Sequence, residues 1–181
     1  MKSVQMFICL AFLAGQAFSQ ECNYRVNNED PSLGISQRKM AFETWFRTFD
    51  PELKSGGENK NVIGRVSLGN LSGSKELSFT VEVKSMKADK VYGQIGVGYP
   101  IKVIIDGGEI IELKAREADP GQVDAKMKST TYETSYRLTD EEFEKFKSTP
   151  VKKLRIFWSE SKFTDHDADF PEVLMRQAEC L

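Results

Sequence analysis

Residues 130–159 read TTYETSYRLTDEEFEKFKSTPVKKLRIFWS, and this stretch decides the fold. Residues 132–138 alternate apolar or aromatic side chains with polar ones, the period of two that places one set on a core and the other in water. After Pro150 the same alternation returns over residues 151–158 and ends in Trp158. The stretch therefore predicts two strands joined by a short helix.

The helix between these strands has a clear start signal. Thr139 is followed by Asp-Glu-Glu, so its hydroxyl can accept a hydrogen bond from the backbone N–H of Glu142, while the Glu142 carboxylate accepts one from the N–H of Thr139. Leu138 and Phe143 occupy the two positions of a hydrophobic staple. The helix is expected to end before Pro150, because proline disfavours helical geometry at the residue before it.

The chain begins with a targeting pattern. Lys2 is the only charge before an apolar run over residues 6–13, and Ala17-Phe18-Ser19 is a small-x-small cleavage site. We interpret residues 1–19 as a signal peptide and residues 20–181 as a single globular β-rich domain. The expected location is secreted or periplasmic. No later stretch reaches the roughly 20 apolar residues of a transmembrane helix, so no membrane insertion is expected.

Composition narrows the classes of partner. The formal net charge is −2 and 40% of the residues are hydrophobic, which is typical of an ordinary folded domain. There is no basic surplus to attract nucleic acid or anionic lipid, so neither is expected as a partner. The sequence does not indicate which partner or ligand the protein has.

Cys9 lies within the predicted signal peptide, so the mature chain would contain two cysteines, Cys22 and Cys180. In an oxidising compartment an isolated pair most simply forms one bridge, so we predict a disulfide between them. Free thiols and an intermolecular bond are the alternatives. A catalytic cysteine would need an activating group such as histidine nearby, which makes that role a weaker interpretation.

Residues 62–68 favour a short strand, and residues 77–84 predict an amphipathic strand, because apolar residues alternate there with polar ones. Residues 27–35 are polar and contain turn formers, so they are expected to be irregular. The glycines between residues 91 and 98 do not precede a helix start, so we interpret them as bends or bulges in a strand and not as a nucleotide-binding loop.

Residues 101–115 predict a hairpin around Asp106-Gly107-Gly108. A two-residue loop would oppose like charges, whereas a three-residue loop with Gly108 at positive φ keeps the isoleucines on one face and pairs Lys102 with Glu112. We predict the three-residue loop.

The aromatic stretch over residues 39–49 fits either a helix or a strand, and its type stays open. The simpler interpretation places its aromatic side chains, Trp45 among them, in the core. The alternative is an exposed platform for a ligand such as a sugar ring, with Trp45 and Trp158 as the candidate residues. Phe157 falls on the polar side of its strand.

Residues 159–169 are expected to form a solvated acidic loop that contains His166, the only histidine. The alternating carboxylates of Asp165, Asp167 and Asp169 resemble the start of a calcium loop. Phe170 stands where the turn glycine of such a loop belongs, so calcium is a hypothesis only. The simpler interpretation has Asp169 capping a final helix.

Known catalytic constellations are not evident. A hydrolase triad would have to use His166, and no G-x-S-x-G elbow occurs. Zinc is disfavoured because the two cysteines and His166 lack ligand spacing. No cofactor is expected. Asn70-Leu71-Ser72 is a glycosylation sequon that matters only if the source glycosylates its secreted proteins.

The order of features resembles a family. A signal peptide, an early cysteine, a D-G-G hairpin, Tyr-x-x-x-Tyr-x-Leu-Thr-Asp-Glu-Glu-Phe, a Val-Lys-Lys-Leu-Arg-Ile strand and a terminal Cys-Leu are similar to small, uncharacterised secreted proteins of bacteria. The resemblance is strongest over residues 101–181. It implies an envelope or secreted location and no particular activity.

Together these patterns predict an α+β fold: a mostly antiparallel, curved β-sheet or sandwich of about seven strands, with a short internal helix and a C-terminal helix. The expected function is that of a non-enzymatic binding or structural module. The alternatives are a small-ligand carrier with an apolar cavity inside the sheet, and a carboxylate-based hydrolase that acts on extracellular glycans.

Overall fold

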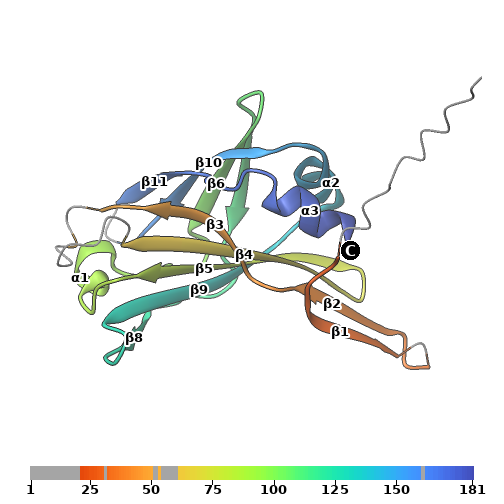
Figure 1. Cartoon of the computed structure of the whole chain (residues 1–181), viewed down its shortest axis with the longest axis horizontal. Helices are drawn as coiled ribbons and strands as arrows, with labels where there is room; N and C mark the ends of the chain where they lie inside the picture. The colour runs from red at the N-terminus through yellow and green to blue at the C-terminus, as the bar shows by residue number, and fades with distance from the viewer. Residues whose placement is uncertain (1–20, 31, 51–52, 54–60, 160–161) are drawn as a thin grey trace, which may run out of the picture.

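A computed structural model describes residues 21–30, 32–50, 53, 61–159 and 162–181. These residues form two antiparallel β-sheets and three short helices, which confirms the predicted α+β class (Figure 1). The predicted signal peptide, residues 1–19, lies outside the described residues. Within the described ranges, no helix has the length and apolar character needed to cross a bilayer.

The larger sheet has seven strands. Its main order is β1 (Tyr24–Asp30), β2 (Ile35–Met40), β4 (Val62–Leu71), β5 (Ser74–Val83), β9 (Ser129–Arg137) and β8 (Gln122–Asp124). The remaining strand, β3 (Glu43–Thr48), pairs with the first half of β4, while β2 pairs with its end. Because β5 pairs with the whole of β4, β2 and β3 share the other edge of that strand.

The smaller sheet has four strands in the order β11 (Phe163–Asp167), β10 (Val151–Phe157), β6 (Pro100–Ile105) and β7 (Ile110–Lys114). The β6–β7 hairpin confirms the predicted three-residue loop. The backbone N–H of Ile105 donates to the carbonyl of Glu109 at 3.0 Å, and Lys102 lies opposite Glu112, with which it forms an ion pair. Gly108 has a φ of 86°.

The core lies between the two sheets. Its largest fully buried side chains come from both layers: Trp45, Phe46, Phe79, Tyr132 and Tyr136 from the larger sheet, and Ile101, Leu154 and Ile156 from the smaller. The layers also approach at their edges, where the N–H of Arg116 donates to the carbonyl of Ser135 at 3.2 Å. Alternation in the two strands of residues 130–159 is thus confirmed, with β9 and β10 in different sheets.

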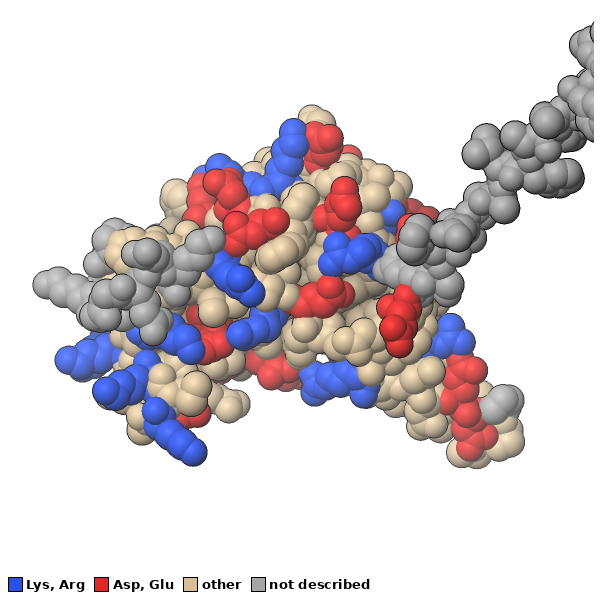
Figure 2. Space-filling view, viewed as in Figure 1, with Lys and Arg blue, Asp and Glu red and all other residues tan. Residues whose placement is uncertain are grey.

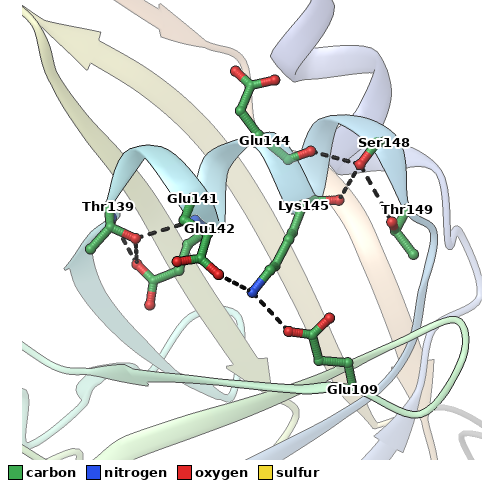
Figure 3. Close-up of polar contacts among 8 residues, drawn as sticks. All are labelled: Glu109, Thr139, Glu141, Glu142, Glu144, Lys145, Ser148 and Thr149. Atoms are coloured by element: carbon green, nitrogen blue, oxygen red, sulfur yellow. Dashed lines mark hydrogen bonds and ion pairs between the residues drawn. The ribbon is translucent and has the colours of Figure 1, made fainter.

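The helices are α1 (Ala88–Tyr92), α2 (Asp140–Ser148) and α3 (Val173–Glu179). The predicted capping box of α2 is present: the Glu142 N–H donates to Thr139 Oγ1 at 3.2 Å, and the Thr139 N–H donates to Glu142 Oε2 at 2.7 Å (Figure 3). Lys145 pairs with both Glu141 and Glu109, which ties the helix to the β6–β7 hairpin (Figure 3).

A glycine in β4 makes room for an aromatic ring. A Cβ built on Gly64 would lie 2.1 Å from Cε1 of Phe46, far inside van der Waals contact. Phe46 is fully buried and belongs to β3, the strand paired with this part of β4. The missing side chain of Gly64 therefore lets the Phe46 ring lie directly on the backbone of the neighbouring strand.

The predicted disulfide is present. Cys22 and Cys180 are bonded, with their Cα atoms 5.8 Å apart and a sequence separation of 158. The Tyr24 hydroxyl donates to the carbonyl of Cys180 at 2.6 Å, which adds a second link between the start of β1 and the end of α3.

Three predictions about local structure were wrong. Residues 27–35 are not irregular, because most of them belong to the β1–β2 hairpin that projects from the larger sheet (Figure 1). Residues 91–98 are not a bent strand: α1 ends at Tyr92, and Gly93, at a φ of 77°, follows it as the C-cap. Residues 163–167 are the strand β11 and not part of an acidic loop.

The sequence left open whether residues 39–49 form a helix or a strand. Most of this stretch is the strand β3. A shift in its register between Thr44 and Phe46 allows both Trp45 and Phe46 to be buried. This irregularity explains why the aromatic spacing also fitted a helix.

Candidate functional site

An aromatic surface pocket lies at the end of the smaller sheet, where β10 ends and β11 begins. Its volume is about 320 Å³. We call it the Trp158 pocket, and its lining residues are Tyr99, Pro100, Phe157, Trp158, Ser159, Lys162 and Phe163.

Strand pairing brings most of this lining together. Phe157 lies opposite Phe163 at the end of the β10–β11 ladder, and their ring centroids are 6.0 Å apart. The Trp158 N–H donates to the Lys162 carbonyl at 3.0 Å, which holds the two strands together beyond that pair. Because β6 is the other neighbour of β10, its first residue, Pro100, reaches the same place.

Trp158 forms a rigid part of the pocket wall. Only 2% of its surface is exposed. Its indole stacks on the ring of Tyr92 at 4.8 Å between centroids and meets Tyr132 edge to face at 5.0 Å. The indole Nε1–H donates to Thr164 Oγ1 at 3.0 Å. These contacts fix the ring before any ligand arrives.

Tyr99 and Phe163 are the accessible aromatic side chains of the pocket, with 37% and 53% of their surfaces exposed. Tyr99 lies against Gly96, where an added Cβ would come within 3.1 Å of the tyrosine ring. The guanidinium of Arg155 lies 4.2 Å from the centroid of Phe163 and also binds Asp165 through two hydrogen bonds of 2.7 Å. Both rings are therefore supported from within the fold.

Polar groups line one part of the pocket. Ser159 accepts a hydrogen bond from the Gln94 N–H at 2.9 Å, and its own N–H donates to the Gln94 carbonyl at 3.0 Å. This pairing attaches the segment that follows α1 to the end of β10. Lys162 is exposed and also lines the pocket.

The two candidate platform residues, Trp45 and Trp158, lie in different environments. Trp45 is fully buried and meets Phe79 edge to face at 6.0 Å, so the platform interpretation is wrong for Trp45 and the core interpretation is right. Trp158 is also buried, yet it lines the pocket. It contributes a wall of a pocket and not an exposed platform.

The aspartates of the calcium hypothesis are engaged by basic or backbone groups. Asp165 binds Arg155, and Asp167 forms an ion pair with Lys153 at 3.5 Å. Asp169 accepts a hydrogen bond from the backbone N–H of Arg47 at 2.7 Å, so it does not cap α3, whose N-cap is Glu172. In the described part of the chain, no group of three Asp, Glu, His or Cys residues is arranged to hold a metal ion.

His166 points into the core, and its neighbours on β11, Asp165 and Asp167, point into solvent, as side chains alternate along a strand. It is 4% exposed, and its Nε2 lies 2.9 Å from Thr164 Oγ1. Burial disfavours the charged imidazolium and lowers the pKa of His166 to about 4, although the negative charge of Asp165 acts in the opposite direction. The imidazole is thus a neutral, structural group at physiological pH.

Sequence patterns alone did not identify Tyr99, Lys162 or Phe163 as a group. One signal was available: Phe157 falls on the polar side of its strand, and a large aromatic residue at such a position indicates a surface contact. Joining it to Tyr99 requires the pairing of β10 with β6, which no local pattern reveals.

The chain matches no protein-family model, and no curated protein is detectably similar to it.

Proposed function

We propose that this protein is a secreted, non-enzymatic binding module, and that the Trp158 pocket binds a carbohydrate ring. The observation that carries the proposal is the convergence of Tyr99, Phe157, Trp158 and Phe163 on one open pocket. Aromatic faces offer flat apolar surfaces on which the C–H face of a sugar ring can stack. Ser159 and Lys162 supply polar groups for the hydroxyls at its rim.

The dimensions of the pocket support a small ligand. Its volume of about 320 Å³ is at the lower end of the range for small-molecule sites. The fixed indole of Trp158 lowers the entropic cost of binding, because the wall is already ordered. A ligand of one or two rings fits this description best.

Two other functions suggested by the sequence have less support. A carrier would hold its ligand between the sheets, but that space is filled by buried side chains such as Trp45, Phe46 and Phe79. A carboxylate-based hydrolase would need two acids that face the ligand. The described lining of the Trp158 pocket contains neither Asp nor Glu.

The secreted location rests on the signal-peptide pattern and on chemistry. A disulfide such as Cys22–Cys180 is compatible with an oxidising compartment outside the cytosol.

Binding can be tested by isothermal titration calorimetry with soluble cello-, xylo- and chito-oligosaccharides. We expect Tyr99→Ala and Phe163→Ala each to weaken the affinity about tenfold, since both remove an accessible stacking surface. Phe170→Ala is the matched control, because Phe170 is an exposed aromatic residue that does not line the pocket.

Two results would contradict the proposal. One is the absence of binding to every oligosaccharide tested at millimolar concentration. The other is binding that Tyr99→Ala and Phe163→Ala leave unchanged, which would move the site elsewhere.

A further inference from the structure

Two loops emerge side by side at one end of the larger sheet. The end of β5 pairs with the start of β9, where Val83 lies opposite Thr130. The Thr130 hydroxyl donates to the carbonyl of Ser85 at 2.7 Å, which ties the β5–α1 loop to β9. The β8–β9 turn leaves the same end of the sheet, because Asp124 lies opposite Ser129 (Figure 1).

These loops expose apolar side chains. Met86 is 46% exposed, Val123 is 54% exposed and Met127 is 58% exposed. The turn that carries Met127 is ordered by its own hydrogen bonds, since Asp124 Oδ1 accepts from the N–H groups of Lys126 at 2.8 Å and Met127 at 2.9 Å. Met127 is therefore held in its exposed position by an ordered turn.

Lysines surround these apolar residues. Lys87, Lys90, Lys126 and Lys128 are all exposed, and within the described part of the chain none of the four takes part in an ion pair. Basic side chains gather over α1 and the β8–β9 turn, at the lower left of Figure 2. We call Met86, Lys87, Lys90, Lys126, Met127 and Lys128 the lysine tip.

The acidic residues that the structure describes near the lysine tip offset only part of its charge. Asp124 keeps its negative charge while it accepts hydrogen bonds from its own turn, and the charge of Glu82 is offset by Arg65 and Lys84. Asp89 is the remaining exposed acid on α1. The formal net charge of −2 is thus unevenly distributed, with a positive excess at this end.

We propose that the lysine tip docks onto the surface of an anionic lipid bilayer. Exposed lysines near such a surface each add favourable electrostatic energy, and their aliphatic stems can lie along apolar groups while the ammonium stays at the headgroups. The methionines stand on protruding loops and not in a groove, so a flat, soft surface can receive them. A soluble polyanion would use the lysines and leave the methionines without a role.

Net charge gave no reason to expect anionic lipid, because it averages over the whole surface. The fold separates the charges, and the lysine tip is the local exception.

The test is co-sedimentation of the full chain, without its signal peptide, with vesicles of phosphatidylcholine alone and of phosphatidylcholine with phosphatidylglycerol. We expect binding only to the vesicles that contain phosphatidylglycerol. Lys126→Gln combined with Lys128→Gln should reduce the partition coefficient about 25-fold, roughly fivefold for each lysine. Met86→Ser combined with Met127→Ser should reduce it about tenfold.

Two matched controls come from other exposed sites. Leu33→Ser removes an apolar side chain that is 70% exposed in the β1–β2 turn, and Lys147→Gln removes an exposed lysine from α2. Both should leave vesicle binding unchanged. Melting temperatures of all variants should match that of the parent, because every substituted side chain is exposed.

Three results would overturn the proposal. The first is no binding of the parent protein to phosphatidylglycerol vesicles. The second is equal binding to both kinds of vesicle. The third is binding that depends on the lysines but not on the methionines, which would assign the lysine tip to a soluble polyanion. Tyr99→Ala should not change vesicle binding, so this test is independent of the Trp158 pocket.

Discussion

The imidazole ring of His166 is stacked on the phenyl ring of Phe46, with the ring centroids 4.2 Å apart and the planes 11° from parallel. The contact joins β11 of the smaller sheet to β3 of the larger one. A neutral imidazole fills this position as an aromatic ring does, whereas an imidazolium would lose its hydration there. The contact therefore links the stability of the core to the protonation of one side chain.

We predict that acid weakens the fold through His166. Its pKa is about 4 in the folded state and about 6.5 in the unfolded chain, so between these values only the unfolded state binds the proton. The stabilising contribution is complete above about pH 6.5, is lost as the pH falls, and changes no further below about pH 4. The loss amounts to about 3 kcal/mol.

Urea unfolding from pH 4 to pH 8 measures this effect. His166→Phe keeps an aromatic ring beside Phe46 and should remove the corresponding slope, while contributions from other titrating groups remain in both proteins. Parallel curves for the parent and the variant would show that the imidazole is not held neutral. Because the chain has one histidine, its imidazole resonances in NMR give the folded pKa directly.

Gly64→Ala should destabilise the protein by about 1–3 kcal/mol, since the new methyl group would overlap the Phe46 ring. In most strands the same change would be neutral or favourable, because glycine is a poor strand former. The measurement is a double-mutant cycle with Phe46→Leu. The cost of Gly64→Ala should shrink when the ring is absent, and an unchanged cost would mean that the clash is not with Phe46.

Thr139→Ala should cost about 1 kcal/mol, because it leaves an N-terminal N–H of α2 without its side-chain acceptor. Thr139→Ser keeps the hydroxyl and should be close to the parent. Ser148→Ala serves as the control at the other end of the helix, where the hydroxyl donates to the Glu144 carbonyl inside the helix and caps no N–H group. Chemical denaturation of the three variants gives the comparison, and equal losses at both ends would argue against the cap.

Replacing Cys22 and Cys180 by serine should destabilise the protein by up to about 5 kcal/mol, the chain-entropy limit for so long a loop. A smaller loss is expected if the unfolded chain keeps residual structure. Urea unfolding with and without reducing agent tests this: the parent should lose stability on reduction and the serine variant should not respond. A parent protein indifferent to reduction would contradict the prediction.

Sequence patterns sufficed where local signals and burial agree. In residues 130–159 the capping residues, the staple and the alternation all have their causes within a few positions, so β9, α2 and β10 were predicted correctly. The loop of the β6–β7 hairpin was predictable for the same reason, because only one length keeps Lys102 opposite Glu112.

The patterns failed where a strand lacks an apolar face. Every residue of β1 is exposed or half-buried, and its second half, Asn27 to Asp30, is polar throughout, so no alternation marked it as a strand. The hairpin with β2 is held by backbone pairing and by the ion pair of Arg38 with Glu29. In β11 the inward residues are Thr164 and His166, which are polar, so the strand resembled an acidic loop. The Trp158 pocket could not be predicted from sequence, because Tyr99 is brought beside the residues of β10 and β11 only by tertiary structure.

The bond between Cys22 and Cys180 also makes a closed covalent ring of nearly everything in the fold. A pulling force applied between these two positions is carried by the S–S bond, so neither sheet bears the load and the ladders between strands are not peeled apart. Under tension between these two positions, the oxidised protein would behave as a short inextensible link. Reduction would remove this covalent path, and the same force would then be carried by noncovalent contacts, the hydrogen bond from Tyr24 to the Cys180 carbonyl among them.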